Sequence, residues 1–175
     1  MKRILMTIPV VLLNVAVLCL PASAQAGKLE NSSTQDLLIK SEVETAVSML
    51  QAIFTKHQQG EMTLEQAKKL GAGLLRELRY GNEGYFWADT TEGINVVLYG
   101  RKDVEGRNRL EDKDLKGTFY VKEFISKGKA GGGYAEYWFP KKGKSKAQPK
   151  RSYLLLFKPF GWVVGSGYYL VEKSK

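Results

Sequence analysis

The last part of the chain, residues 131–170, contains three consecutive segments with the alternating, aromatic-rich pattern of β-strands. A basic loop with glycine and proline joins the first two segments, and the turn Pro159-Phe160-Gly161 joins the last two. Aromatic and β-branched residues fit a pleated sheet, and glycine and proline fit its turns. This three-stranded meander constrains the fold most, because every upstream segment must pack on the sheet or cover it.

Two helices are predicted ahead of the sheet. Apolar residues recur every three or four positions over residues 34–58, which is typical of an amphipathic helix that Ser33 or Thr34 can cap. Residues 63–66 (Thr-Leu-Glu-Gln) have the capping-box pattern, so we expect a second helix that starts there and stops at Gly81.

The pattern changes from helical to extended after the second helix. Residues 85–89 and 94–99 predict a β-hairpin, and residues 118–126 predict a short amphipathic helix. The polar loop between them, residues 100–117, is long for a structureless connection, which is typical of a functional or ligand-covering segment. The economical arrangement is an α+β fold, in which the helices pack on one side of a five-stranded antiparallel sheet.

The N-terminal segment has the pattern of a secretory signal peptide. Two basic residues precede the apolar run 4–20, and small residues after it fit cleavage after Ala24 or Ala26. We assign residues 1–24 to the signal peptide and 25–33 to a flexible segment, and we expect a periplasmic or secreted protein. The alternative is that residues 4–20 remain as an inner-membrane anchor.

The formal net charge of +9 indicates what kind of molecule the protein can bind. A basic chain is often a nucleic-acid-binding protein, but export argues against that, so we expect an anionic ligand or surface and no nucleic acid. The only cysteine, Cys19, lies in the predicted signal peptide, so the mature chain has no disulfide. With His57 as the only histidine, the mature chain also lacks the usual ligands of a zinc or haem site.

Several ordered motifs together resemble one known family. They are RYGNEGYFWADTTEGINVVLYG, GRN, DKDLKGTFYVKEFI, GGGYAEYWFPKKG and PKRSYLLLFKPFGWVVGSGYYL, and they extend over about residues 35–171. This part of the chain is similar to the second type of single Cache domain, an extracytoplasmic sensor domain of chemoreceptors and histidine kinases. The resemblance implies one Cache domain over residues 34–172. It has a long N-terminal helix on one face of a PAS-like antiparallel sheet and a small-molecule pocket on the other.

The resemblance also implies what the domain binds and which proteins read it. Family ligands are typically short carboxylates such as acetate, propionate, lactate or pyruvate. Many members have His-Pro where this chain has Tyr99-Gly100-Arg101, which bears on the ligand preference. Receptor members continue into a transmembrane helix, whereas this sequence ends at Lys175. We therefore expect a stand-alone sensory module that passes its bound state to a partner in signal transduction or chemotaxis, such as a membrane receptor or a histidine kinase.

A rival interpretation keeps the fold and removes the ligand. In that case the domain is a structural or protein-interaction module, its pocket is filled by its own side chains, and it forms a homodimer through the N-terminal helix. No catalytic constellation stands out in the sequence, so we expect neither an enzyme nor a cofactor. Gly165-Ser166-Gly167 lies inside a strand, where glycine more often permits close packing than marks a nucleophile.

A pocket for a small anion requires a cation or convergent hydrogen-bond donors, and aromatic walls that exclude water. The candidates of these types on the predicted strands and loop are Tyr85, Trp87, Arg101, Tyr137, Lys150, Arg151 and Tyr153. We expect Arg101 and one of Lys150 or Arg151 to bind the acid group, and the aromatic residues to form the wall. The competing interpretation is that the aromatics are core and the cations are solvated, and a one-residue shift of register would exchange the two faces.

Two further patterns have simpler interpretations. Acidic residues within 112–123 partly match a calcium-binding loop, but Lys116 occupies a ligand position, so we expect no metal and infer that Asp114 orders the turn into the next helix. The basic residues of 141–151 are typical of a solvated hairpin tip, with Lys150 and Arg151 as the candidates for exceptions.

Overall fold

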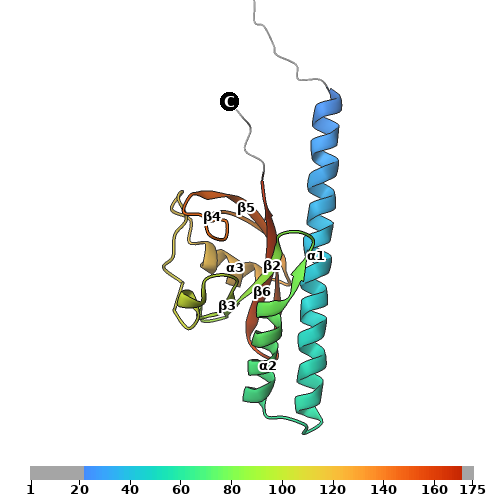
Figure 1. The fold of residues 1–175 in the computed structure, drawn as a ribbon, viewed down its shortest axis with the longest axis vertical. Helices are drawn as coiled ribbons and strands as arrows, with labels where there is room; N and C mark the ends of the chain where they lie inside the picture. The colour runs from blue at the N-terminus through green and yellow to red at the C-terminus, as the bar shows by residue number, and fades with distance from the viewer. Residues whose placement is uncertain (1–21, 171–175) are drawn as a thin grey trace, which may run out of the picture.

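The computed structural model describes residues 22–170, and their side chains from Ser33 onward (Figure 1). The elements in chain order are α1 (Ala22–Gln58), α2 (Leu64–Glu77), β1 (Arg79–Tyr80), β2 (Gly84–Thr90), β3 (Asn95–Leu98), the 3₁₀ helix η1 (Lys102–Val104), α3 (Tyr120–Lys129), β4 (Gly133–Pro140), β5 (Ala147–Phe157) and β6 (Trp162–Tyr169). This confirms the predicted α+β fold with a PAS-like sheet and a long N-terminal helix.

The sheet contains the five predicted strands and one short addition. Its order is β1-β2-β6-β5-β4, β3 pairs with the same strand β2, and the strand pairs are antiparallel. The predicted hairpin is β2–β3 and the predicted meander is β4–β5–β6. The last strand of the meander, β6, pairs with β2 of the hairpin, so strands far apart in the sequence form the centre of the sheet.

One face of the sheet is covered by α1 and α2. The apolar stripe of α1 is buried there, as its spacing predicted, and it consists of Ile39, Val43, Ala46, Leu50 and Ile53. The helix α1 extends well beyond the sheet at its N-terminal end (Figure 1). Burial of this stripe against the sheet is what holds the long helix in place, because apolar burial is the dominant stabilising contribution in folding.

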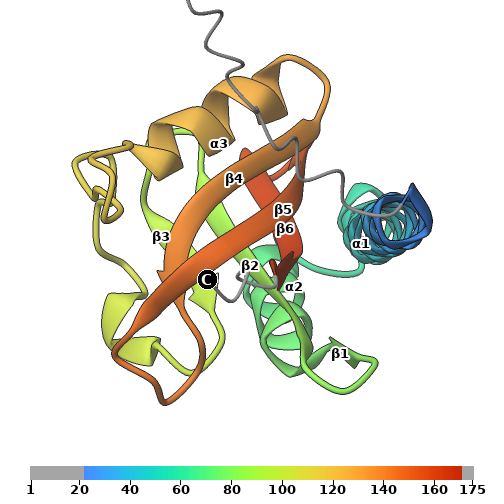
Figure 2. The same cartoon turned by 90° about the horizontal axis from the view of Figure 1, so that it is seen from above.

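The expectation that all helices lie on one side of the sheet is wrong. Figure 2 shows α3 on the face opposite α1. The apolar face of α3 packs on β4 and β5 through residues such as Val121 and Phe124. A β-carbon at Gly128 would lie 2.9 Å from a methyl group of Val163, so the glycine lets α3 approach the sheet closely. The sheet is therefore covered on both faces, with a separate cluster of buried side chains on each.

Two helix boundaries differ from the prediction. The helix α1 begins at Ala22 rather than near Thr34, so the segment predicted to be flexible, residues 25–33, is helical. The capping box of α2 is confirmed, but this helix ends at Glu77. It ends early because Arg79 and Tyr80 pair with β2 as the short strand β1. Gly81, with φ of +52°, then turns the chain from β1 into β2 instead of ending a helix.

The helices in the described part of the chain include none that is long and apolar enough to cross a membrane. The predicted signal peptide, residues 1–24, and the alternative anchor, residues 4–20, lie outside the described residues, apart from residues 22–24 at the start of α1.

Candidate ligand-binding site

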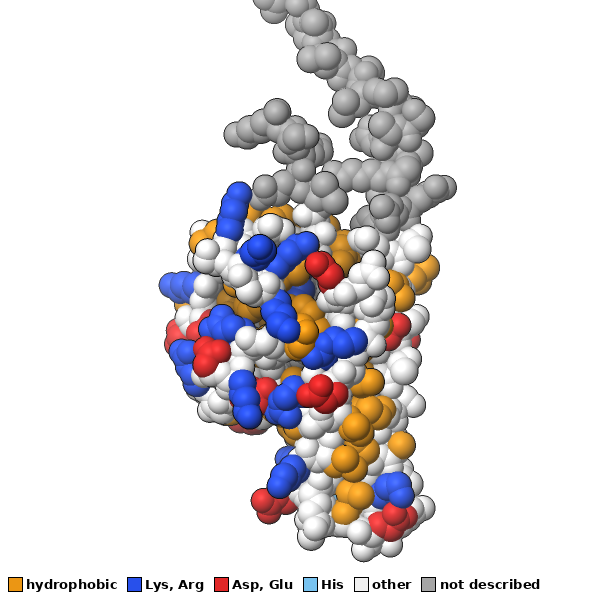
Figure 3. All heavy atoms as spheres, in the orientation of Figure 1, with side chains coloured by type: hydrophobic (Ala, Val, Ile, Leu, Met, Phe, Trp, Pro, Cys, Tyr) orange, Lys and Arg blue, Asp and Glu red, His pale blue; other side chains and the backbone are white. Residues whose placement is uncertain are grey.

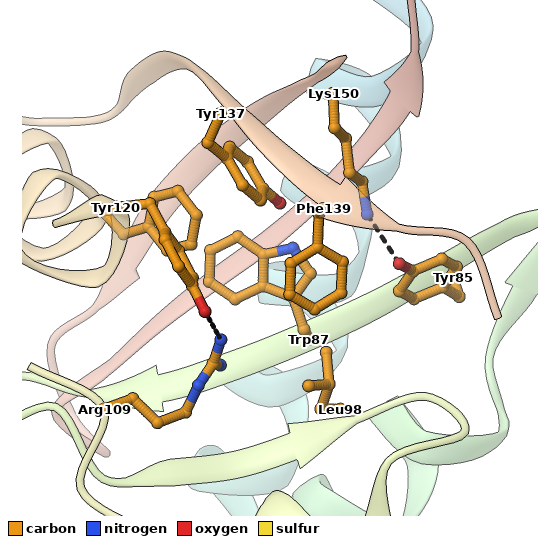
Figure 4. Close-up of a pocket in the computed structure, with 9 residues that line it drawn as sticks. Tyr85, Trp87, Leu98, Arg109, Tyr120, Tyr137, Phe139 and Lys150 are labelled. Atoms are coloured by element: carbon orange, nitrogen blue, oxygen red, sulfur yellow. Dashed lines mark hydrogen bonds between the residues drawn. The ribbon is translucent and has the colours of Figure 1, made fainter. Parts of the chain in front are cut away.

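A small cavity lies between the sheet and α3. Its lining is mainly aromatic with two basic side chains, and it consists of Tyr85, Trp87, Leu98, Arg109, Tyr120, Phe124, Tyr137, Phe139 and Lys150 (Figure 4). The volume is about 10 Å³, which is room for about one water molecule. A carboxylate of two or three carbons fits only after some of these side chains move apart.

Strand alternation brings these side chains to one face. Tyr85 and Trp87 are two residues apart on β2, Tyr137 and Phe139 are two apart on β4, and Lys150 lies on β5. Side chains two residues apart on a strand point to the same side of the sheet, and in this case that side faces α3. The register of β4 with β5 places Tyr137 directly opposite Lys150.

Lys150 is a cation buried without an acidic partner. Its side chain is 1% exposed, and its Nζ donates a hydrogen bond of 2.7 Å to the hydroxyl of Tyr85. None of the ion pairs among residues 33–170 involves Lys150. Burial lowers the pKa of the ammonium, but the oxygens of Tyr137 and Tyr85 raise it by more, so the group is charged at neutral pH. A buried charge of this kind is costly unless an anion joins it.

Arg109 is the second buried cation, and it already has partners. Its guanidinium contacts the carboxylates of Asp89 and Asp112, each at 3.2 Å, and donates to the hydroxyl of Tyr120 at 3.0 Å. Burial lowers the pKa of Arg109, but the charge of Asp89 outweighs it and the net shift is upward. The pKa of Asp89 is raised, because its burial outweighs the attraction of Arg109. Arg109 is thus neutralised within the fold, and Lys150 is not.

Trp87 carries a buried hydrogen-bond donor with no partner. The residue is 2% exposed, and its indole Nε1 has no acceptor among the described residues. Figure 4 shows the indole at the centre of the cavity, with its nitrogen on the side of Tyr137 and Lys150. Buried donors in folded proteins are nearly always paired, so this nitrogen can donate to an acceptor that enters the cavity, a water molecule or a ligand oxygen.

The position of Trp87 depends on a glycine in β6. Gly165 is the register partner of Trp87, and a β-carbon at residue 165 would overlap the indole ring. On its other side the indole stacks on Phe124 of α3, with ring centres 4.5 Å apart. The Gly165-Ser166-Gly167 segment therefore permits close packing, as the sequence predicted.

The structure brings four of the seven predicted site residues together. Tyr85, Trp87, Tyr137 and Lys150 line the cavity, and among the two alternatives on β5 it is Lys150 that faces it. The hydroxyls of the two tyrosines bond within the protein, since Tyr85 accepts from Lys150 and Tyr137 bonds to Ser152 at 3.1 Å. Their role in binding stays a prediction.

The other three predicted residues lie elsewhere. Arg101 is at the surface, at the start of η1, and pairs with Asp103 two residues further along the loop at 3.1 Å. Arg151 and Tyr153 point to the opposite face of β5, toward α1. Alternation along β5 requires this, because Lys150 and Arg151 are neighbours and cannot share a face.

Sequence reasoning missed Arg109, Tyr120 and Phe139. Arg109 could have been found from its partner, because Asp89 ends a strand of buried aromatics and a buried carboxylate needs a cation. The expectation for Asp114 is confirmed. Its Oδ1 accepts from the backbone nitrogens of Lys116 and Thr118, which orders the turn into α3, and its other oxygen accepts from the backbone of β4.

A long helix on one face of a PAS-like sheet and a small aromatic cavity on the other are the features that the sequence resemblance implies. The sequence profile of the Single Cache domain 2 family matches residues 32–174. The chain therefore belongs to this family, and the predicted resemblance is confirmed.

Relatives and solved structures agree with this assignment. The chain is 32% identical over 137 residues to the sensor histidine kinase MctS of Rhizobium johnstonii and 30% identical over 135 residues to the methyl-accepting chemotaxis protein McpP of Pseudomonas putida. These matches cover 78% and 73% of the chain but only 29% and 24% of the relatives, so the chain spans about a quarter of their length.

Two solved structures superpose over most of the chain. One is a periplasmic sensor domain of a chemotaxis protein, with a TM-score of 0.76 and 29% identity over 80% of this chain and 97% of that one. The other is a Cache chemosensory domain described for its recognition of carboxylic acids, with a TM-score of 0.77 and 29% identity over 81% and 97%.

Proposed function

We propose that this domain binds a short monocarboxylate in the cavity between the sheet and α3 and passes the bound state to a signalling partner without converting the ligand. The charged Lys150 would pair with the carboxylate, and Nε1 of Trp87 would donate to one of its oxygens. The aromatic rings around them would exclude water and surround the short carbon chain. Recognition of carboxylic acids by a solved Cache domain with 29% identity supports this ligand class.

The observation that carries the proposal is the unpaired charge of Lys150. A structural domain with a filled interior would have little reason to retain a buried ammonium whose polar partner is a tyrosine hydroxyl. The small cavity volume, taken alone, favours such a filled interior. The buried ammonium and the unpaired indole nitrogen favour a site that is completed by an anion.

The expected partner is a receptor or kinase that reads the position of α1. This helix is joined to the sheet by a cluster of charged and tyrosine side chains. Arg151 on β5 donates to both carboxylate oxygens of Asp36 on α1, at 2.8 and 2.9 Å, and Tyr168 donates to the same group. Since Arg151 follows Lys150 in sequence, a ligand that moves β5 also moves the attachment of α1. Homodimerisation through α1 also stays a proposal, and Leu37 and Leu38 are exposed on that helix.

Thermal unfolding of the protein with acetate, propionate, lactate and pyruvate tests this function. A ligand that binds only the folded state stabilises it by about 2.7 kcal/mol at a hundred times its dissociation constant. Propionamide, which has nearly the same shape as propionic acid but no charge, should give no shift. Failure of all four acids to raise the melting temperature would contradict the proposed ligand class.

The Lys150→Met variant tests the site, and Lys158→Met on an exposed turn is its matched control. Truncating one partner of a buried charge pair costs about 2–5 kcal/mol of binding free energy. Isothermal titration should therefore show affinity weakened by about 30-fold or more for the first variant and unchanged for the second. Equal affinity of Lys150→Met and the wild type would remove Lys150 from the site.

A further inference from the structure

A second, larger hollow adjoins the cavity on its solvent side. This outer groove has a volume of about 290 Å³. Its lining contains three lysines, three tyrosines, one acid and one amide, namely Lys141, Lys142, Lys144, Tyr85, Tyr99, Tyr169, Glu83 and Asn82. It lies between the loop after β4 and the turn before β2. The groove is open to solvent and large enough for a short carboxylate, whereas the inner cavity is not.

Tyr85 forms the partition between the two spaces. Among the described residues it is the one that lines both the inner cavity and the outer groove. Its hydroxyl accepts from Lys150 on the inner side, and its ring lies 5.4 Å from the ring of Tyr99 on the outer side. Rotation of this single side chain would join the two spaces and would free the ammonium of Lys150.

The outer groove carries an excess of positive charge. Lys141 is paired with Glu83 at 3.4 Å, but Lys142 and Lys144 are in none of the ion pairs among residues 33–170. The ammonium of Lys142 donates a hydrogen bond of 2.6 Å to the hydroxyl of Tyr99, which holds it at the rim of the groove. Basic side chains also gather on the sheet side of the molecule, with fewer over α1 and α2 (Figure 3).

We propose that the outer groove is an anion-binding site that captures the carboxylate first, and that Tyr85 is the gate through which the ligand reaches Lys150. This inference rests on the proposed function. The exchange conserves the polar contacts of Lys150, because the incoming carboxylate replaces the hydroxyl of Tyr85 as the acceptor. The groove has three lysines and one glutamate, and such an excess of positive charge raises the local concentration of an anionic ligand and its association rate.

Stopped-flow measurement of propionate binding, followed by tryptophan fluorescence, tests the groove. In the double variant Lys142→Gln/Lys144→Gln the association rate should fall by about tenfold at low ionic strength. Its salt dependence should flatten, and the dissociation rate should stay unchanged. The control is Lys127→Gln/Lys158→Gln, which removes the same charge away from the groove and should leave the association rate unchanged.

The gate is tested by Tyr85→Phe, with thermal unfolding to verify that the variant is folded. This change removes the hydroxyl that accepts the hydrogen bond of Lys150 in the free protein. Propionate then has no competitor for the ammonium and should bind several-fold more tightly. Weaker binding would assign Tyr85 to direct contact with the ligand and overturn its role as a competitor. Tyr85→Ala, which removes the partition, should accelerate both association and dissociation.

The outcomes separate this inference from the function on which it rests. Suppose that propionate binding depends on Lys150 but that propionate associates with the groove variant at the wild-type rate. The outer site is then wrong, and the inner site stands. If propionate does not bind to the wild type at all, both the inner site and the outer site are contradicted. A loss of affinity that appears only in the dissociation rate would also overturn the outer site, because a capture site acts on association.

Discussion

The two faces of the sheet are built on different principles. The face under α1 and α2 is an apolar core, and its main charged cluster, Arg151 with Asp36, is fully paired. The face under α3 is aromatic, and it buries Lys150 without an acid and an indole nitrogen without an acceptor. Both faces exclude solvent to a similar degree, so burial alone does not distinguish them.

The difference shows where a functional site lies in a fold of this kind. Arg151 on the α1 face is paired within the chain and adds to stability, whereas Lys150 on the α3 face remains available to an anion from outside the chain. A natural protein departs from complete polar pairing mainly at functional sites. Removal of Lys150 should therefore affect binding more than stability, and removal of Arg151 should affect stability more than binding.

The largest effect is expected from Asp89→Asn on the α3 face. Asp89 is the fully buried one of the two acids that pair with Arg109, so its loss leaves a buried guanidinium with only the more exposed Asp112. Breaking a buried ion pair on one side costs about 3–5 kcal/mol of unfolding free energy. Urea unfolding measures the change, and Asp103→Asn, which breaks a surface pair, should cost less than about 1 kcal/mol. Equal costs would show that Asp89 and Arg109 are not coupled.

The sharpest comparison is between Lys150→Met and Arg151→Met, which are neighbours on opposite faces of β5. Removing Lys150 should change the unfolding free energy little, because no acidic partner is left unpaired in the interior. Removing Arg151 should lower it by about 1.5–3 kcal/mol, the range for hydrogen bonds to charged groups. Urea unfolding gives both values, and propionate titration should show that only the first variant loses affinity. The reverse order of stabilities would contradict the division between the faces.

Gly165→Ala tests how the α3 face holds Trp87. The added methyl group would overlap the indole, so the ring must move, at a cost of about 1–3 kcal/mol for an overpacked core. Ligand affinity should fall as well, because Nε1 of Trp87 leaves its place. The control is Gly73→Ala on α2, where a β-carbon meets nothing within 4 Å and should stabilise the helix by about 0.5–1 kcal/mol. Unchanged affinity in Gly165→Ala would remove Trp87 from the site.

Most of the fold could be predicted from the sequence, because strands and helices leave periodic patterns. Alternation along β5 requires that Lys150 and Arg151 point to opposite faces of the sheet, so only one of these two predicted candidates could line the cavity. The start of α1 could not be predicted, because residues 27–33 are polar and Ser33 is a good cap, although the helix continues through them. The placement of α3 was missed because an amphipathic helix shows which of its own faces is apolar and not which face of the sheet it covers.

The candidate site was predictable only where it lies on strands. Tyr85, Trp87, Tyr137 and Lys150 share a face because of alternation, which the sequence displays. Arg101 and Arg109 both lie between β3 and α3, and that segment has no period from which a direction can be deduced. One of them meets Asp89 in the interior and the other meets Asp103 at the surface. Only the course of the loop in space decides which arginine enters the cavity.

The smallest effect is the pH dependence of stability, and it tests the Asp36–Arg151 pair that joins α1 to the sheet. Burial raises the pKa of Asp36, but the hydrogen bonds from Arg151 and Tyr168 lower it by more, so the net shift is below the ordinary value of 3.8. The unfolded chain then takes up this proton at higher pH than the folded chain does. Asp36 therefore stabilises the fold at neutral pH, and this contribution is lost as the pH falls from about 4 through the lowered pKa.

Urea unfolding between pH 7 and pH 3 measures the acid limb that Asp36 produces. Asp36→Asn should be less stable than the wild type at pH 7 and should lose less stability on acidification, because the titrating group is gone. Arg151→Met should flatten the same limb, since Arg151 is the largest favourable influence on the pKa of Asp36. Parallel profiles in all three proteins would show that the Arg151–Asp36 pair does not hold α1 to the sheet in solution.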